Sequence, residues 1–244
     1  MSKLRLVIGN KNYSSWSLRA WLYLELSGVS FEEERIALFR GDFRERIARY
    51  SPAGRVPVLV ELPEGEGGGG DVDGDDAPIC VWDSWAIIEH VRERFEGMAL
   101  DWPRAPAARA EARAIAAEMH AGFGALRQQM PFNVRARRKI DPRGDAALWR
   151  DVERVREIVV GCRERHLHQG RWLYGDLSIA DVMYAPVALR LLSYQVELRG
   201  VLADWVHAIN LLPAVARWVA AAEAEREQIP EIDELRADAL VSLG

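Results

Sequence analysis

The sequence has little cysteine, no excess of basic residues and no long hydrophobic run, and each absence excludes a class of protein. Its two cysteines, Cys80 and Cys162, lie far apart, which excludes a zinc knuckle and a C-x-x-C redox pair. We therefore expect both thiols to be free and buried. The apolar N-terminal run is too short for a signal peptide, and no later run is long enough to span a membrane. A cytoplasmic protein without a membrane partner is expected.

The composition is that of an ordinary globular protein. Hydrophobic residues make up 49% and charged residues 28% of the 244 residues, and the net charge of -5 gives no reason to expect a nucleic-acid partner. A chain of this length can bury roughly 70–75% of its unfolded surface, in one or two domains.

The first part of the chain alternates between short strands and helices. Hydrophobic periodicity predicts the order β-α-β-α-β-β-α, in which the last two strands can pair as a hairpin. The expected elements are Leu4–Ile8, Ser15–Leu26, Ser30–Ile36, Asp42–Arg49, Val56–Leu62, Ile79–Val81 and Ser84–Phe95.

Strand signals almost vanish after a linker at 98–106, whose proline-containing part is Asp101–Pro106. The remainder shows the apolar spacing of helices, so the second half is predicted to be all-helical. The expected helices are Arg109–Met130, Asp145–His166, Ile179–Tyr194, Pro213–Glu227 and a shorter piece at Val201–Ala208.

The segment 63–78 between two predicted strands is acidic and rich in glycine, so we expect a mobile, solvated loop. An EF-hand calcium loop requires glycine sixth and glutamate twelfth, whereas Asp71–Trp82 has glycine fourth and ends in tryptophan. The glycine run also lacks the Lys-Ser/Thr of a phosphate-binding P-loop. His166 and His168, two residues apart on a predicted helix, point to different faces. No metal is predicted.

The first candidate site is the junction between the strand-like run Leu4–Ile8 and the helical pattern that follows. Ser14 and Ser15 stand where that helix begins. A helix N-terminus offers unpaired backbone N–H groups and a positive dipole end, and two hydroxyls beside it can hold an anion or a thiolate. Both serines are equally typical of an ordinary helix cap. These residues alone do not decide between the two interpretations.

The second candidate site is Val56-Pro57, which precedes an apolar strand. Proline has no N–H for a sheet ladder, so Pro57 must lie at the first residue of the strand or at an edge. This leaves the backbone groups of Val56 available to an extended ligand, and a cis bond before Pro57 would suit such a site. An ordinary turn is the alternative.

The third candidate site is Asp83-Ser84, directly before a helical pattern. We expect Ser84 to cap the helix and to turn its hydroxyl and the first-turn N–H groups toward a carboxylate. Asp83 supplies a negative charge for an ammonium group. Opposite charges side by side fit an amino-acid moiety, and a plain Asp-Ser cap is the alternative.

Ser178 and Asp181 have the spacing of a helix capping box, in which each side chain bonds the backbone N–H of the other residue. Leu177 and Val182 can form the hydrophobic staple around it. The role is structural, and loss of such a cap costs about 1 kcal/mol.

In this order and spacing the motifs resemble those of the cytosolic glutathione transferase superfamily. The resemblance covers nearly the whole chain and implies a thioredoxin-like α/β domain at 1–97, a linker at 98–106 and an all-helical domain at 107–244. Glutathione is the implied co-substrate, and a homodimer is the implied assembly. The serine-type zeta and theta classes are most similar, since Ser14–Arg19 follows the zeta pattern S-S-C-S-x-R with Trp16 in place of the cysteine.

The resemblance also assigns roles to individual residues. Ser14, with Ser15 as the second choice, is the implied catalytic donor to the glutathione sulfur. Val56 would bind the cysteinyl backbone of glutathione, and the acid-serine pair would hold its γ-glutamyl group. The implied glutathione-binding residues are Ser17, Arg55, Val56, Pro57, Asp83 and Ser84.

A thiolate held there would attack an electrophilic carbon of a small, mostly apolar second substrate. Met119, Phe123 and Met130 are the candidate pocket residues, because methionine and aromatic side chains form an adaptable apolar wall. Core packing is the alternative for all three.

Two sets of basic residues carry similar alternatives. Arg19, one turn inside the first helix, could add positive potential to the thiol site or could be solvated. A basic cluster could attract an anionic electrophile or could be exposed charge on a loop, and its members are Arg135, Arg137, Arg138 and Lys139.

Three functions follow from this reading. The leading one is a glutathione S-transferase, and the second is a glutathione-dependent cis–trans isomerase of the maleylacetoacetate type. The third is a non-enzymatic interaction module built on the same fold.

Overall fold

The computed structural model describes residues 3–63, 77–95, 97–141 and 144–234. The chain forms two compact units that divide between Ala99 and Leu100, and each is described by itself. The predicted linker at 98–106 spans this division, and the first helix of the second unit begins at Pro106.

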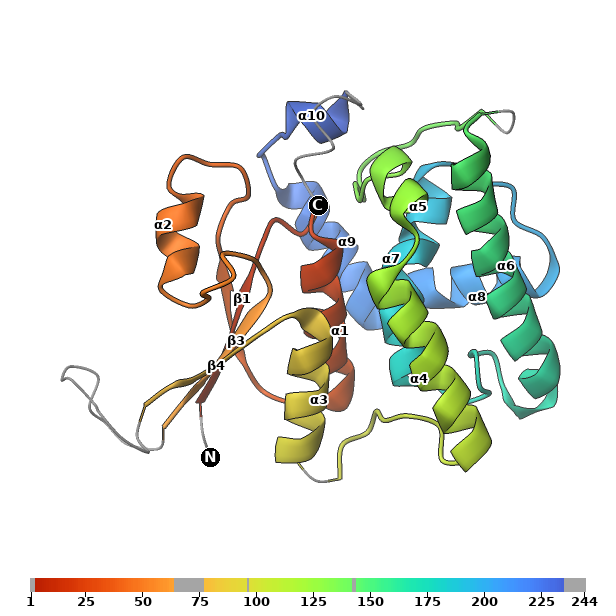
Figure 1. Ribbon diagram of the computed structural model, residues 1–244, viewed down its shortest axis with the longest axis horizontal. Helices are drawn as coiled ribbons and strands as arrows, with labels where there is room; N and C mark the ends of the chain where they lie inside the picture. Colours follow the sequence, from red (N-terminus) through yellow and green to blue (C-terminus); the bar gives the residue numbers. More distant parts are fainter. Residues whose placement is uncertain (1–2, 64–76, 96, 142–143, 235–244) are drawn as a thin grey trace. The chain divides into compact units, whose positions relative to one another are not determined.

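Unit 1 has the predicted order β-α-β-α-β-β-α (Figure 1), which confirms the expected α/β fold. Its sheet runs in the order β2-β1-β3-β4, with β1 parallel to β2 and antiparallel to β3, and with β3 and β4 antiparallel as predicted for a hairpin. The elements are β1 Lys3–Ile8, α1 Ser15–Ser27, β2 Glu32–Arg35, α2 Phe43–Ala48, β3 Val58–Leu62, β4 Ile79–Trp82 and α3 Ser84–Arg94. The calcium-loop, P-loop and mobility expectations for the segment between β3 and β4 fall on 64–76, outside the described residues.

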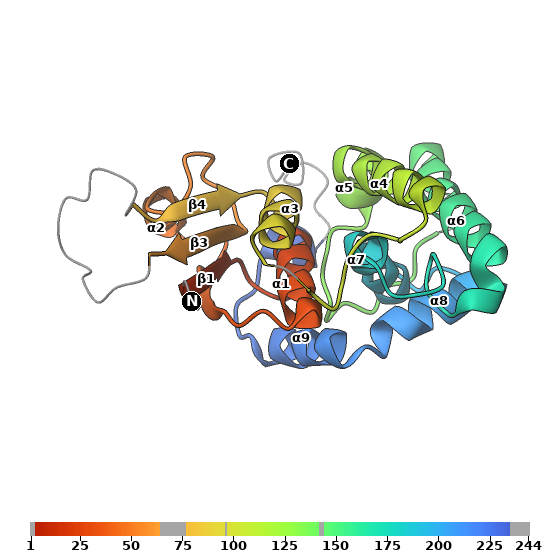
Figure 2. The same cartoon turned by 90° about the horizontal axis from the view of Figure 1, so that it is seen from below.

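Successive side chains of the central strands β1 and β3 point to opposite faces of the sheet, and both faces are apolar. Val7, Val58 and Val60 pack with Ile47 of α2 on one face. Helices α1 and α3 pack side by side on the other face (Figure 2). Both central strands are therefore held between helices, which fixes the positions of their ends.

Unit 2 is all-helical, as predicted. Helix α7 is buried along almost its whole length, and α4 and α8 pack against it (Figure 1). A helix that is apolar on all sides is stable only in a core, so α7 is the centre of this unit. The helices are α4 Pro106–Ala121, α5 Gly124–Gln129, α6 Ala146–His166, α7 Ile179–Ser193, α8 Gly200–Asn210, α9 Pro213–Ala224 and α10 Pro230–Asp233, with a 3-10 turn at Leu167–Gln169.

The prediction of one continuous helix between α4 and α5 is wrong. The expected helix Arg109–Met130 breaks at Gly122 and Phe123, where Phe123 has a left-handed φ of 60°. A Cβ at Gly122 would lie 2.8 Å from the carbonyl oxygen of Glu118, so glycine permits this turn. Arg127 then donates to the carbonyl oxygens of Met119 and His120 at the end of α4. A side chain thus replaces the backbone bonds that a continuous helix would supply.

The predicted capping box of α7 is present, and its carboxylate also accepts hydrogen bonds from residues outside the box. The backbone N–H and the hydroxyl of Ser178 both donate to Oδ2 of Asp181, each at 3.0 Å. Oδ1 accepts from the backbone N–H of Leu173 at 3.0 Å and from Nε1 of Trp205 at 2.9 Å. Asp181 is fully buried, so these four donors replace its hydration and join α7 to α8 and to the turn before α7.

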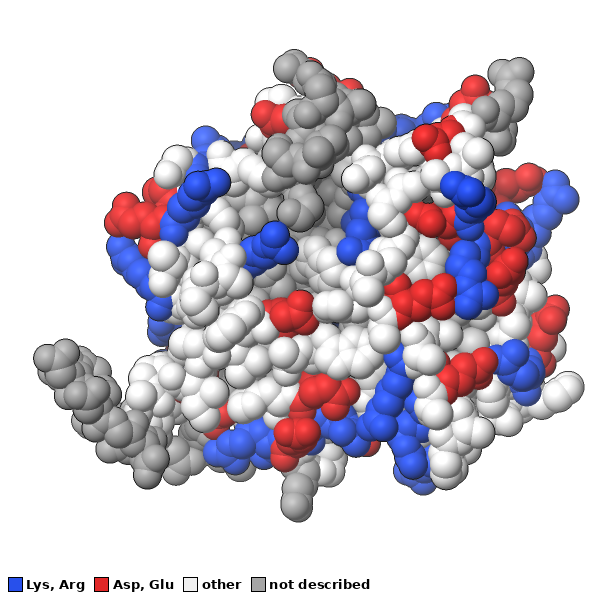
Figure 3. All heavy atoms as spheres, in the orientation of Figure 1, with Lys and Arg blue, Asp and Glu red and all other residues white. Residues whose placement is uncertain are grey.

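Charged side chains of both signs are interspersed over the face shown in Figure 3. Within the described residues, no helix combines the length and apolar character needed to cross a bilayer.

Candidate active site

Three of the predicted motifs come together at one edge of the sheet in unit 1. Val58 of β3 pairs with Val7 of β1 and with Trp82 of β4, so the end of β1, the start of β3 and the end of β4 lie in line. Pro57 directly precedes Val58 and Asp83 directly follows Trp82, so the Val56-Pro57 and Asp83-Ser84 motifs both adjoin this last pair of the ladder. Motifs that are separated by 26 residues or more in the chain are thereby made neighbours.

The junction between β1 and α1 is held by serine side chains. Ser14 is the N-cap of α1, and its Oγ accepts from the N–H of Ser17 at 3.2 Å. The hydroxyl of Ser14 also donates to Oγ of Ser17 at 2.8 Å, and that oxygen accepts from the N–H of Gly9 at 3.1 Å. The capping alternative for Ser14 is therefore realised. Ser17, with no exposed area, ties the end of the strand to the helix.

Asn10 stabilises the loop between β1 and α1, and the sequence offered no reason to select it as a site residue. Its backbone oxygen accepts from the N–H groups of Tyr13 and Ser14 at 3.1 and 2.9 Å, and its Oδ1 accepts from the N–H of Leu38 at 2.8 Å. A lone asparagine in a loop carries no periodic signal that would have identified it. Its contacts hold the start of α1 against the chain that follows β2.

The solvated alternative for Arg19 is wrong. Its side chain is 1% exposed, and its guanidinium carbon lies 4.5 Å from the ring centroid of Trp16. Trp16, the residue that departs from the zeta pattern, thus covers the arginine one helical turn away. A buried guanidinium can be accommodated beside an aromatic face because the ring attracts cations.

The peptide bond between Val56 and Pro57 is cis. The strand ladder begins at Val58, two residues later than predicted, because Pro57 has no N–H to donate. Before it, the chain turns at Ser51, whose backbone oxygen accepts from the N–H of Gly54 at 3.1 Å. Val56 is half-buried and Arg55 is exposed beside it.

The prediction that Ser84 caps α3 is wrong, because the cap is Asp83. Asp83, at a φ of 81°, is the N-cap, and its Oδ1 accepts from the N–H groups of Trp85 and Ala86 at 2.8 and 3.4 Å. The left-handed backbone at Asp83 places its short carboxylate over the first turn of the helix. Ser84 is instead the first helical residue, 1% exposed, and its Oγ has no hydrogen-bond partner within the described residues. An unsatisfied buried hydroxyl costs about 1–3 kcal/mol.

The proposed second-substrate residues belong to the interior of unit 2. Met119, Phe123 and Met130 are 0%, 6% and 0% exposed, and they flank the break between α4 and α5. Packing of the helical core accounts for their apolar character. Their role in substrate binding stays a prediction.

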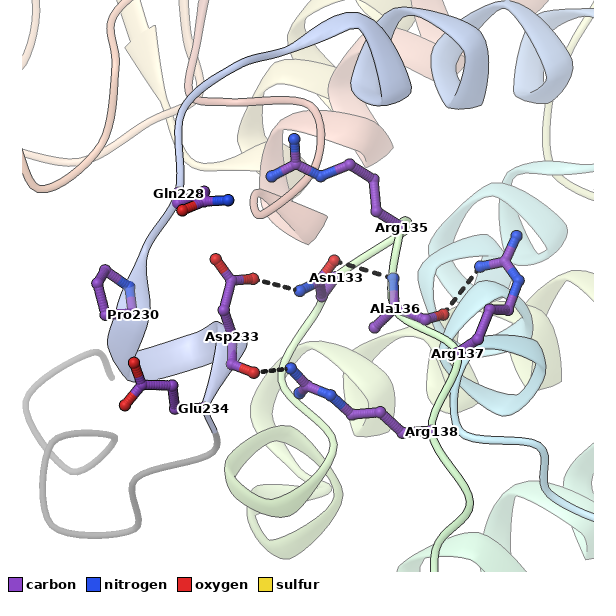
Figure 4. A pocket seen from close by; sticks show the side chains of 9 residues that line it. All are labelled: Asn133, Arg135, Ala136, Arg137, Arg138, Gln228, Pro230, Asp233 and Glu234. Carbon is purple, nitrogen blue, oxygen red and sulfur yellow. Dashed lines mark hydrogen bonds between the residues drawn. The ribbon is translucent and has the colours of Figure 1, made fainter.

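The members of the basic cluster differ in their surroundings. Arg135, Arg137 and Arg138 line a cavity of about 380 Å³ in unit 2 (Figure 4), whereas Lys139 is exposed and does not line it. Among the residues that the structure describes, no group of three or more His, Cys, Asp or Glu side chains is placed to hold a metal ion.

Both cysteines are free thiols, as predicted, but only Cys162 is fully buried and Cys80 is half-buried. Burial raises the pKa of the Cys80 thiol. Burial also raises the pKa of the Cys162 thiol, and a hydrogen bond to Tyr174 partly opposes it. Neither thiol has the low pKa of a reactive cysteine.

The N-terminal part of the chain matches one family model, and one curated relative matches most of the chain. Residues 13–94 match the family model of the glutathione S-transferase N-terminal domain. A curated relative from Caenorhabditis elegans, named a probable maleylacetoacetate isomerase, is 26% identical over 188 residues, which is 77% of this chain and 79% of the relative.

Solved structures share the fold of the chain. A glutathione transferase homolog from Burkholderia GL BGR1 with bound glutathione is 20% identical with a TM-score of 0.63, covering 91% of this chain and 100% of its own. A homolog from Lodderomyces elongisporus with two glutathione molecules per subunit is 18% identical with a TM-score of 0.64, covering 90% of this chain and 99% of its own. The chain therefore has the thioredoxin-like and helical fold that glutathione transferases share, and its residues 13–94 are similar to their N-terminal domain.

Proposed function

We propose that this chain binds glutathione at the sheet edge of unit 1 and transfers its thiolate to a small electrophile. The observation that carries the proposal is the pairing of Val58 with Trp82, the pair that the Val56-Pro57 and Asp83-Ser84 motifs both adjoin. One motif offers backbone groups to a peptide, and the other offers a hydroxyl and a carboxylate to an amino-acid end. A tripeptide with a γ-glutamyl group has the chemistry that both require.

The γ-glutamyl end fits the start of α3. Its carboxylate would accept from the buried hydroxyl of Ser84, which has no partner among the described residues, and would lie at the positive end of the helix. Its ammonium group would face the exposed carboxylate of Asp83, which lies at the surface. Binding would thus satisfy the hydroxyl that folding leaves without a partner.

The cysteinyl part fits the start of β3. Because the ladder of β3 begins at Val58, the N–H and C=O of Val56 lie outside it and face an extended peptide as a neighbouring strand would. This positions the sulfur toward the N-terminus of α1.

The sulfur would meet the hydroxyl of Ser14, with Ser15 as the second choice. Ser14 can turn its proton from Ser17 to the sulfur while its oxygen still accepts the N–H of Ser17. Lowering a thiol pKa by two units from 8.5 requires about 2.7 kcal/mol, which a charge-assisted hydrogen bond and a helix dipole can supply. The buried charge of Arg19 adds to the same positive potential.

The thiolate then attacks the electrophilic carbon of the second substrate. A carbon–sulfur bond forms, and the leaving group departs with the bonding electrons. Met119, Phe123 and Met130 are the proposed apolar contacts of that substrate. A homodimer and a cytoplasmic location, both implied by the family resemblance, are part of this proposal.

A glutathione-dependent cis–trans isomerase is the second candidate. It is supported by the name of the curated relative and by the arginines that line the cavity of unit 2. One assay, the consumption of glutathione during turnover, distinguishes the two activities. An isomerase converts a cis-configured dicarboxylate to its trans isomer without consuming glutathione, whereas a transferase consumes one glutathione for each product.

Calorimetric titration with glutathione tests the binding site. We expect Ser84→Ala to weaken binding about tenfold, because the ligand carboxylate loses its donor. Ser27→Ala is the matched control, since Ser27 is also a buried serine with an unpartnered Oγ among the described residues, at the far end of α1. Unchanged affinity in Ser84→Ala, or no binding by the unmodified chain, would contradict the proposal.

Turnover of a generic aromatic halide tests the chemistry. Ser14→Ala should lower kcat by about tenfold while glutathione still binds, because one hydrogen bond to the thiolate is lost. Ser15→Ala is made in parallel to identify the donor. Equal kcat in both variants and in the unmodified chain would remove the serine mechanism.

A further inference from the structure

The loop 37–42 between β2 and α2 starts at the same edge of the sheet as the proposed glutathione site. Strands β1 and β2 are parallel, and their ladder ends with Ile8 beside Arg35. The N–H of Ile36 then donates to the backbone oxygen of Ile8 at 2.9 Å. Because β1 and β2 run in the same direction, both strands end at one edge, where β3 begins and β4 ends. The carboxyl ends of parallel strands are a common place for ligand sites in α/β folds.

Asn10 joins this loop to the serine at the start of α1. Its Oδ1 accepts from the N–H of Leu38 at 2.8 Å, and its backbone oxygen accepts from the N–H of Ser14 at 2.9 Å. A Cβ at Gly9 would lie 2.9 Å from Cγ of Leu38, so glycine lets the leucine side chain pack directly on the backbone at the end of β1. Leu38 is therefore held next to the segment that carries Ser14.

Phe39, the next residue, combines two unfavourable features. Its φ of 56° lies in the left-handed region, which is strained for a bulky side chain. It is also 55% exposed, so the burial of its ring recovers little free energy. Among the described residues, the other non-glycine positions with positive φ are buried Phe123, Asp83, which caps α3, and polar Gln195. Phe39 alone in this part of the chain is strained, apolar and exposed.

The residues on both sides of Phe39 are held by hydrogen bonds. Leu38 is fixed by Asn10, and the backbone oxygen of Arg40 accepts from the N–H of Phe43 at 3.0 Å, where α2 begins. A backbone conformation that is kept against the preference of its residue, at the edge of a candidate site, is typical of a functional position. An exposed aromatic ring is suited to contact an apolar ligand, and an aromatic ligand most of all.

We propose that Phe39 determines specificity for aromatic electrophiles, with its ring in contact with the ring of the substrate while the sulfur of glutathione lies at Ser14. This inference rests on the function proposed above and names a substrate class for it. The contact lies within unit 1. It favours an aromatic substrate over a small aliphatic one, because only the aromatic substrate offers a ring to pack against.

Two electrophiles that differ in the ring test this contact. With chlorodinitrobenzene and with iodoethane, the sulfur forms a bond to the carbon that carries the halogen, and the halide leaves with the bonding electrons. Each reaction consumes one glutathione for each product, and only chlorodinitrobenzene contains a ring. KM for both electrophiles is measured at saturating glutathione, in the unmodified chain and in variants of Phe39.

Phe39→Gly removes the ring and the strain together, since glycine adopts a positive φ readily. We expect KM for chlorodinitrobenzene to rise about fivefold, which corresponds to one aromatic pair, while KM for iodoethane and Kd for glutathione change by no more than about twofold. The urea midpoint should not fall, so the loss of affinity is separated from a structural role. Phe39→Tyr keeps the ring and should keep KM for chlorodinitrobenzene within about twofold.

Leu211→Ala is the matched control, because Leu211 is also a large, exposed apolar residue but belongs to unit 2. It should change neither KM by more than about twofold. Unchanged KM for chlorodinitrobenzene in Phe39→Gly, an equal rise in both KM values, or turnover of iodoethane alone would overturn this inference and leave the proposed glutathione transfer standing. No turnover of either electrophile by the unmodified chain would contradict the proposed function and this inference with it.

Discussion

Trp16 lies over the guanidinium of Arg19, with 4.5 Å between the guanidinium carbon and the ring centroid. The two residues are one turn apart on α1, and the arginine is 1% exposed. The tryptophan ring therefore contributes both a packing surface and an attraction to the buried charge. It occupies the position at which the related zeta pattern has a cysteine.

Removal of this ring should cost stability. We predict that Trp16→Leu lowers the free energy of unfolding by about 1–3 kcal/mol, since it removes the cation–π contact and part of the cover of Arg19. Trp16→Phe keeps an aromatic face and should lose less than half as much. Urea unfolding monitored by circular dichroism measures both variants, and equal losses would show that the ring face is not what matters.

Ser17 should be more sensitive than its small size suggests. Ser17→Ala leaves the N–H of Gly9 without its acceptor inside the protein, so we predict a loss of about 1–3 kcal/mol. Ser17→Thr keeps the hydroxyl and tests whether the volume can be accommodated. Chemical denaturation supplies the comparison, with Ser30→Ala, at an exposed serine before β2, as the control. A loss below about 0.5 kcal/mol in Ser17→Ala would mean that water replaces the hydroxyl.

Asp181 should be among the most costly single positions in unit 2. Asp181→Ala leaves four buried donors without an acceptor, and we predict a loss of about 3–5 kcal/mol or failure to fold. Trp205→Phe removes one of the donors and should cost less. Asp204→Ala, at an exposed position on the same helix as Trp205, is the control and should change stability by no more than about 0.5 kcal/mol. Soluble yield and denaturant midpoints report the outcome.

The two thiols should react slowly in the folded protein. Burial raises the pKa of both Cys80 and Cys162, so at pH 7 to 8 each is less ionised than a free thiol of pKa about 8.5. Because the thiolate is the reactive form, alkylation of half-buried Cys80 should rise about tenfold per pH unit below its pKa and stay slower than that of glutathione. Mass spectrometry after timed iodoacetamide treatment measures this. Cys80→Ser should retain activity, and rapid labelling at pH 7 would contradict the raised pKa.

Periodicity was sufficient for most of the architecture because it reports burial directly. The order of strands and helices in unit 1 follows from the short apolar runs of β1 and β3, from alternation around β2 and from helical spacing in α1 and α3. The box of Ser178 and Asp181 could be identified because both bonds depend on a fixed spacing along the chain. These features are local, or repeat along the chain, so one sequence contains them.

What the sequence did not indicate depended on single backbone angles and on distant contacts. Phe123 continues the helical spacing of Met119 and Met130, so the break at Gly122 left no trace in the apolar pattern. Asp83 and Ser84 both favour helix caps, and a φ of 81° decided between them. The burial of Arg19 depends on Trp16, and no intrinsic preference of either residue encodes that contact.

The shared carboxylate at the base of α7 also has a practical consequence for genetics. A mutagenesis screen that scores only lost turnover would recover substitutions at Asp181 and Trp205 alongside those at Ser14, although the first two residues lie in unit 2 and serve its framework. Measuring expressed, soluble protein before measuring rates would sort the framework alleles from the chemical ones.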